Sequence, residues 1–280
     1  MKCGSGRCKV AKSKVPGRAP TVTTRTVVVG GPTLGRDYAE AWRACLASQE
    51  VEGWRVVVMP MLDEGHEQAG DYDPQRHSWT ASAMRRVGRL RSAYVEAALA
   101  AGADAVLLCD DDILMGPGVL ACLLQHDAPI VYGVFWTVTN SGLRPQVWER
   151  HPNTLSIDGA RALADGLSVE VYGGGACTLL RGEALQLYRW EPLPGLPREY
   201  LWQGEDRAAC VRATVHGLRQ VAVGAVGSSL VHLYYPEQRE PAYVADSVSR
   251  LWGDNLSRSD EAPGEERAWQ VSDDLQDRDA

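Results

Sequence analysis

Long apolar runs are scarce in this chain of 280 residues. No segment approaches the roughly 18 consecutive apolar residues that a membrane-spanning helix requires, and the N-terminus has no apolar core of the kind found in secretory signal peptides. The sequence therefore predicts neither a membrane span nor secretion, and the expected location is cytoplasmic. The 7 cysteines are an odd number and lie mostly in apolar segments, which is typical of buried thiols in a reducing compartment.

Two common nucleotide-binding signatures are also absent. Neither Gly30-Gly31-Pro32 nor the triplet Gly173-Gly174-Gly175 fits the dinucleotide-binding fingerprint with its downstream acid. No glycine-rich loop ends in the lysine and hydroxyl residue of a phosphate-binding P-loop. These absences argue against an NAD-dependent enzyme and against a P-loop NTPase.

Charge is distributed unevenly along the chain. The net charge of -7 argues against a general nucleic-acid coat, yet all 7 charged residues between positions 1 and 25 are basic. Residues 254–280 hold 9 acids and 3 bases. Neither end carries enough apolar surface to offset the entropy of ordering, so we expect a disordered basic arm over 1–25, one folded domain over 26–253 and a disordered acidic tail over 254–280. Cys3 and Cys8 would be half of a zinc site, but no second ligand pair lies nearby.

Apolar segments alternate with helical patterns in the first half of the chain. The sequence predicts strands over residues 26–29, 55–59, 105–109 and 130–134, and helices over 38–49, 87–101 and 118–125. This alternation is typical of right-handed βαβ units, so we expect an α/β fold with a mostly parallel, Rossmann-like sheet covered by helices on both faces. In the second half of the chain, the sequence predicts a strand over 169–172, helices over 182–190 and 206–215, and short strands around Val221 and Leu230.

The strand predicted over 105–109 stops at three consecutive acids, Asp110, Asp111 and Asp112. In open α/β sheets, ligands bind at the carboxyl ends of the strands. Carboxylate oxygens suit Mg²⁺ or Mn²⁺, and such an ion keeps open positions that phosphate oxygens can fill. The acids therefore predict a site for a metal-bound phosphate ester; the alternative is a solvated acidic turn.

Three further features have both a chemical and a structural interpretation. Glu205 and Asp206 open a predicted helix, where they either cap the helix or provide a general base. His232 lies in a strand-like run and is either a structural hydrogen-bonding residue or a metal ligand. The triplet Gly173-Gly174-Gly175 allows a ligand to approach the backbone closely, and a flexible turn explains it equally well.

The order of these features along the chain resembles that of the GT-A fold glycosyltransferases, especially those like glycosyltransferase family 2. The resemblance covers roughly residues 26–235. In it, Asp110 to Asp112 correspond to the DxD motif and Gly173 to Gly175 to the glycine-rich segment on the acceptor side. Glu205-Asp206 corresponds to the late ED motif, and His232 to a histidine on a later strand that often completes the metal site. The implied fold is GT-A, a Rossmann-like sheet with a smaller acceptor-side region.

The resemblance also implies a role for each residue. Asp112 and His232, with Asp110 nearer the ribose or the metal-bound water, would hold Mn²⁺ or Mg²⁺. Asp206 would be the general base, with Glu205 as the second candidate. The donor, a UDP- or GDP-sugar, would be contacted by Thr33, Asp63, Arg91, Asp110 and Asp111. Where the family often has Asn after the arginine, this chain has Ser92. The acceptor would lie against Gly173, Gly174, Gly175 and Trp202.

The expected function is therefore sugar transfer from a nucleotide-sugar donor to an acceptor hydroxyl, with inversion if Asp206 lies across the anomeric carbon from the metal. The acceptor class stays open among a glycan, a protein side chain, a lipid-linked carrier and a modified nucleic-acid base. One alternative is a nucleotidyltransferase acting on a sugar phosphate, which would release pyrophosphate. Another is a non-catalytic protein that binds carbohydrate or nucleic acid on a degenerate transferase fold.

Overall fold

The computed structural model describes residues 24–33, 35–62, 72–73, 78–139, 142–149, 155–191, 204–234 and 236–253. Most of the predicted basic arm and the whole acidic tail lie outside these ranges, as do two predicted site residues, Asp63 and Trp202. β1 (Arg25–Gly30) begins one residue before the predicted start of the folded domain, because Arg25 pairs in register with Trp54 of β3 (Trp54–Val58). The Arg25 guanidinium also lies 4.1 Å from the centre of the Trp54 ring.

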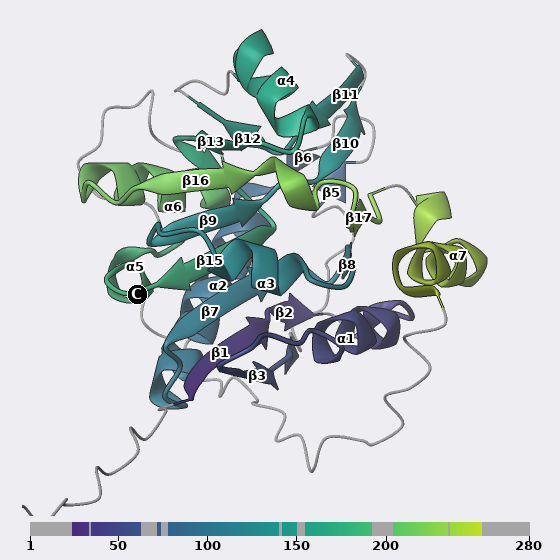
Figure 1. Cartoon of the computed structure of the whole chain (residues 1–280), viewed down its shortest axis with the longest axis horizontal. Coiled ribbons are helices and arrows are strands. Elements are labelled where there is room, and N and C mark those ends of the chain that lie inside the picture. Colours follow the sequence, from purple (N-terminus) through teal and green to yellow (C-terminus); the bar gives the residue numbers. More distant parts are fainter. Residues whose placement is uncertain are drawn as a thin grey trace, which may run out of the picture.

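A seven-stranded sheet forms the centre of the protein (Figure 1). Besides β1 and β3 it contains β7 (Ala105–Cys109), β9 (Ile130–Gly133), β13 (Ser168–Glu170), β15 (Cys177–Arg181) and β16 (Gln220–Val223). Their spatial order is β13-β16-β9-β15-β7-β1-β3. β3, β1 and β7 are parallel to one another, and β9 is parallel to β16. β15 is antiparallel to both β7 and β9, and β13 is antiparallel to β16. The predicted α/β class is confirmed, while the antiparallel strand inside the sheet is an addition that the sequence did not predict.

Helices cover both faces of this sheet, as predicted. They are α1 (Ala39–Ala47), α2 (Ala81–Ala100), α3 (Val119–Leu124), α4 (Ile157–Ala164), α5 (Ala184–Leu187), α6 (Glu205–Val215) and α7 (Pro241–Trp252). Side chains alternate along a strand, so Val27 and Val29 of β1 pack with α1, α3 and α7 in one core, while Val28 packs with α2 and α6 in the other. α5 is much shorter than the helix predicted over 182–190, because residues from Tyr188 onward leave the helix and enter the second core.

Short strand pairs surround the sheet. They are β2 (Pro32–Thr33) with β4 (Met61–Leu62), β5 (Tyr72–Asp73) with β6 (Ser78–Trp79), β8 (Ile113–Met115) with β17 (Leu230–His232), β10 (Trp136–Thr139) with β11 (Gly142–Pro145), and β12 (Val147–Trp148) with β14 (Gly173–Gly174). Two 3-10 turns, Gly224–Val226 and Pro236–Arg239, complete the described elements. The β8–β17 pair places His232 beside the acids that follow β7, and the β12–β14 pair holds two of the predicted acceptor glycines.

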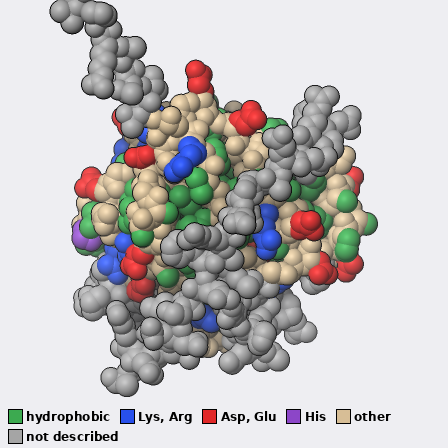
Figure 2. All heavy atoms as spheres, turned by 90° about the horizontal axis from the view of Figure 1, so that it is seen from below, with side chains coloured by type: hydrophobic (Ala, Val, Ile, Leu, Met, Phe, Trp, Pro, Cys, Tyr) green, Lys and Arg blue, Asp and Glu red, His purple; other side chains and the backbone are tan. Residues whose placement is uncertain are grey.

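Within the described ranges, no helix is both long and apolar enough to cross a bilayer. α2 is the longest at 20 residues and contains four arginines. On the face shown in Figure 2, acidic and basic side chains of the described residues are interspersed with apolar ones, and neither charge forms a continuous patch among them.

Candidate active site

The three predicted acids follow β7, and each has a different partner. β7 is buried along its whole length, and a turn closed by a hydrogen bond from the Ile113 N–H to the Asp110 carbonyl (3.0 Å) leads into β8. Asp110 contacts Arg91, Asp111 accepts a hydrogen bond from Thr33, and Asp112 faces His232. The three carboxylates at the end of β7 therefore contact three different elements, α2, β2 and β17.

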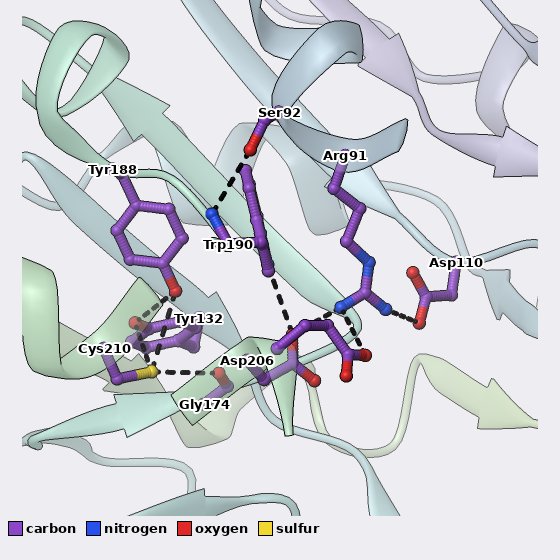
Figure 3. A network of polar contacts seen from close by, with 10 residues as sticks. Arg91, Ser92, Asp110, Tyr132, Gly174, Tyr188, Trp190, Asp206 and Cys210 are labelled. Carbon is purple, nitrogen blue, oxygen red and sulfur yellow. Dashed lines mark hydrogen bonds and ion pairs between the residues drawn. The ribbon is translucent and has the colours of Figure 1, made fainter. Parts of the chain in front are cut away.

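Four residues form what we call the Arg91 cluster: Arg91, Asp110, Glu205 and Asp206 (Figure 3). Arg91 Nη2 lies 2.6 Å from Asp110 Oδ2. Arg91 Nη1 lies 2.5 Å from Asp206 Oδ1 and 3.2 Å from Glu205 Oε1. The Arg91 side chain is only 5% exposed, whereas the carboxylates of Asp110, Glu205 and Asp206 are 26%, 16% and 28% exposed. A buried cation thus binds three acids that remain accessible from solvent.

The charges in this cluster do not balance, because one guanidinium faces three carboxylates. Burial disfavours the Arg91 cation, but Asp110, Asp206 and Glu205 together outweigh burial and raise its pKa. Burial raises the pKa of Asp110, and the neighbouring acids add to that effect against the opposing charge of Arg91. Burial and Asp206 likewise raise the pKa of Glu205. The site has excess negative charge and therefore favours an additional cation or proton.

A glycine on α2 brings α6 close enough for this cluster to form. A Cβ added at Gly88 would lie 3.2 Å from the Trp190 carbonyl oxygen and 3.3 Å from the Glu205 Cβ. Gly88 lies one helical turn before Arg91 on the same helix. The close approach of α6 to α2 at Gly88 therefore also places Arg91 against the start of α6. Gly204 directly precedes α6 and has a φ of 110°. Glycine adopts this backbone conformation without strain.

The glycine triplet is buried, and each glycine gives space to a different neighbour. A Cβ added at Gly173 would lie 2.3 Å from Cys210 Sγ, and one at Gly174 would lie 2.8 Å from the Tyr132 ring. A Cβ added at Gly175 would lie 2.5 Å from Asp206 Oδ2. Close packing therefore explains all three glycines, and Gly175 is the one that adjoins the candidate base. Their contact with an acceptor stays a prediction.

A tight turn connects the triplet to β15. Ala176 has a φ of 55°, and the Cys177 N–H donates to the Gly175 carbonyl across this residue at 2.6 Å. Such a conformation costs an alanine about 1–2 kcal/mol. The Ala176 carbonyl in turn accepts a hydrogen bond from the Asp110 N–H at 2.8 Å. The turn thereby connects the backbone beside Asp206 to the backbone of the first acid.

The third acid, Asp112, lies in a separate group with His232. His232 Nε2 is 3.6 Å from Asp112 Oδ2, while its Nδ1 lies 3.1 Å from the Thr137 hydroxyl. Arg239 Nη2 approaches the same Asp112 oxygen at 3.5 Å. Burial alone would raise the pKa of Asp112, but His232, Arg239 and the more distant Arg36 lower it, so the carboxylate is held in its charged form.

The Asp112–His232 pair fits part of a metal site. A carboxylate oxygen and an imidazole nitrogen face each other, and the other ring nitrogen of His232 is positioned by the Thr137 hydroxyl, as is common for histidine ligands. Asp110, the third predicted ligand, is directed toward Arg91 instead. No three His, Cys, Asp or Glu side chains of the described residues come together as a complete metal site. The remaining ligands would therefore have to be phosphate oxygens and water, which is usual for Mg²⁺.

Asp111 and Thr33 connect the acids to the first turn of the sheet. The Thr33 hydroxyl donates to Asp111 Oδ2 at 2.9 Å and accepts from the Gly35 N–H at 3.1 Å. Thr33 also pairs in register with Leu62 of β4. Asp63 itself lies outside the described residues.

Sequence reasoning missed several residues of the site. The Trp190 indole N–H donates to Asp206 Oδ1 at 3.3 Å, and the Ser92 hydroxyl donates to Glu191 at 2.7 Å. Thr137 and Arg239 support Asp112 and His232 as described above. These contacts join positions between 16 and 127 residues apart, and no local pattern marks them.

A groove of about 610 Å³ lies between α1 and α7. Its lining is mostly apolar, with Tyr38 and Val244 among the contributors. Arg239 also lines it and is therefore shared between the groove and Asp112.

Comparison of the sequence with protein-family models and with curated proteins gives no match. The function is therefore argued from the geometry described above.

Proposed function

We propose that this protein is a metal-dependent glycosyltransferase that moves a sugar from a UDP- or GDP-sugar to an acceptor hydroxyl. One observation carries the proposal: at the sheet edge where β7 ends, Asp112 faces His232, while Asp110 shares the Arg91 guanidinium with the Asp206 carboxylate. Such an edge offers a place for a metal-bound diphosphate on one side and a proton acceptor on the other.

Asp112 and His232 would hold the metal, with Mn²⁺ or Mg²⁺ suited to this pair of ligand types. A bound divalent ion would neutralise the charge that develops on the departing nucleoside diphosphate. Arg239, 3.5 Å from Asp112, brings a further positive charge to the same place. Thr33 and Asp111 line the adjoining turn, where the resemblance places the nucleoside.

Asp206 is the proposed general base. Arg91 and the Trp190 indole both bind Oδ1, and they fix the orientation of the carboxylate. Oδ2 packs closely over Gly175, and the Asp206 side chain is 28% exposed, so a substrate hydroxyl would reach the carboxylate from its solvent side. Asp206 is therefore placed to accept a proton from an acceptor that approaches from the α6 side, and direct displacement with inversion is the proposed outcome.

A donor-hydrolysis screen tests this function. The full chain is incubated with UDP-, GDP-, CMP- and dTDP-sugars in Mn²⁺ or Mg²⁺, and the released nucleotide and pyrophosphate are measured separately. We expect release of a nucleoside diphosphate from one preferred donor, with loss of that release in EDTA.

Two outcomes would contradict the proposal. Release of pyrophosphate from a sugar phosphate and a nucleoside triphosphate would identify a nucleotidyltransferase. Metal-independent binding of carbohydrate or nucleic acid, with no turnover of any donor, would identify a binding protein.

A further inference from the structure

Arg91 connects the two halves of the proposed site. Its Nη2 binds Asp110, which follows β7 next to the proposed metal pair, and its Nη1 binds Asp206 and Glu205 at the start of α6. Asp110 lies 19 positions after Arg91, and Asp206 lies 115 positions after it. A single planar group therefore fixes the distance between residues of two separate elements.

The guanidinium has little capacity left for a substrate. Its two terminal nitrogens are engaged by three carboxylates, the side chain is 5% exposed, and Nε is buried without a hydrogen-bond partner. A donor phosphate would have to displace a carboxylate from Arg91 to reach it. The direct donor contact that the resemblance implies for Arg91 therefore does not match its surroundings.

The helix around Arg91 is itself held firmly. Gly88 allows α6 to approach, and the adjacent Ser92 hydroxyl accepts a hydrogen bond from the Trp190 N–H at 3.3 Å while it donates to Glu191. Trp190 then donates its indole N–H to Asp206 (Figure 3). Two consecutive residues of α2 thus fix Asp206, one directly and one through Trp190.

We infer that Arg91 is a positioning residue that holds Asp110 and Asp206 at a fixed separation, so that the donor side and the proposed base are aligned by the same guanidinium. This inference rests on the proposed function. Arginine suits the task because its rigid fork binds carboxylates in two directions at once, whereas the ammonium of a lysine is a single compact charge. On this account Arg91 acts through Asp110 and Asp206 and does not touch the donor.

A thermal-unfolding cycle tests the connection without any assay of activity. The variants are Arg91→Met, Asp110→Asn, Asp206→Asn and the two pairs that contain Arg91→Met, with Arg89→Met, an exposed residue of the same helix, as the matched control. Arg91→Met removes a buried cation from three clustered carboxylates and should lower Tm by about 10 °C. The change in Tm caused by each Asn substitution should then be several degrees more positive in the Arg91→Met background than in the wild type. Additive shifts for either pair would overturn the inference.

Kinetics of the preferred donor test the consequence for the reaction. Arg91→Lys should lower kcat about 100-fold, because a displacement near 1 Å can cost that much, while the donor KM changes less than about threefold. Arg89→Met should match the wild type in both. A raised donor KM with an unchanged kcat would show that Arg91 touches the donor, and would overturn the inference.

The two failures are distinguishable. If the wild type turns over no nucleotide sugar but the thermal cycle shows coupling, the proposed function fails and the connection through Arg91 stands. If the wild type is active and the cycle is additive, the function stands and the positioning role fails.

Discussion

Two polar clusters lie on the same side of the sheet and share α6, yet they differ in almost every physical respect (Figure 3). The Arg91 cluster is charged, unbalanced and open to solvent through its carboxylates. The second, which we call the tyrosine cluster, consists of Tyr132, Tyr188, Cys210 and Gln220. Its members are fully or almost fully buried. Asp206 of the first cluster and Cys210 of the second are four residues apart on α6.

The tyrosine cluster is neutral and well paired. The Tyr132 hydroxyl donates to Gln220 Oε1 at 2.7 Å and lies 3.0 Å from the Tyr188 hydroxyl, and the Cys210 thiol donates to the Gly174 carbonyl at 3.5 Å. Burial raises the pKa of Tyr132 and Tyr188 well above the usual value, and raises that of Cys210 to about 11. These groups stay uncharged at neutral pH, so this cluster fixes the core, whereas the Arg91 cluster maintains charge at a surface where chemistry can occur.

The largest expected effect is a loss of turnover on substitution of Asp112, which lies next to the Arg91 cluster. Asp112→Asn keeps the size of the side chain but removes the charge proposed to hold the metal, so turnover should fall about 1,000-fold while the fold is retained. Initial rates of donor hydrolysis and the melting temperature measure the two quantities. Asp158→Asn, at a position that is 96% exposed on α4, serves as control. Full activity of Asp112→Asn, or of the wild type in EDTA, would contradict the metal role.

Asp206→Asn should be next in size. Loss of a general base typically costs between 10² and 10⁴ in rate, and donor KM should change little because Asp206 lies on the proposed acceptor side. Steady-state kinetics with the preferred donor and an identified acceptor separate kcat from KM. Equal losses in kcat and in donor affinity would identify Asp206 as a structural helix cap instead.

The neighbouring glycines sharpen the comparison, because each adjoins one cluster. A Cβ at Gly175 would press on the Asp206 carboxylate, so Gly175→Ala should lower kcat by about 10-fold or more with little change in Tm. A Cβ at Gly174 would press on the rigid Tyr132 ring, so Gly174→Ala should lower Tm and leave the kcat of the folded fraction unchanged. Kinetics and thermal unfolding of both variants provide the measurement, and the same pattern in both would remove the distinction between the clusters.

The smallest expected effect concerns the tyrosine cluster alone. Tyr132→Phe removes the hydroxyl that donates to Gln220, which leaves a buried acceptor unpaired and should cost about 1–3 kcal/mol of unfolding free energy. Urea unfolding measures this loss, and donor turnover should be unaffected. A loss of activity without a loss of stability would show that the two clusters are coupled.

The sequence was sufficient for the general architecture and for where the acids lie. Alternating apolar and helical segments predicted the first strands of the sheet and helices on both faces, and the apolar run of β7 predicted where Asp110 to Asp112 would emerge. These are local patterns, and burial on both faces of a strand leaves a clear signal in its residues.

Other features depend on contacts that no local pattern encodes. The segment 177–180 does not show its direction, so the insertion of β15 antiparallel to β7 and β9 was not predicted. The partners of Arg91 lie on two distant segments, and an arginine on a helix is usually exposed. For the glycine triplet the sequence suggested the approach of a ligand or a flexible turn, whereas the fold packs the side chains of Cys210, Tyr132 and Asp206 against these glycines.

The reversed direction of β15 has a consequence for how this protein could diversify. β9 ends at the edge that carries the acids, and β15 begins at that same edge. Of the described residues in the excursion between them, only β13 joins the sheet, at its end and antiparallel to β16. Substitutions or changes of length in this excursion need not alter the register of any parallel strand. The parts of this excursion outside β13 can therefore be remodelled to fit a new recipient, while the half proposed to bind the nucleotide keeps its parallel strands.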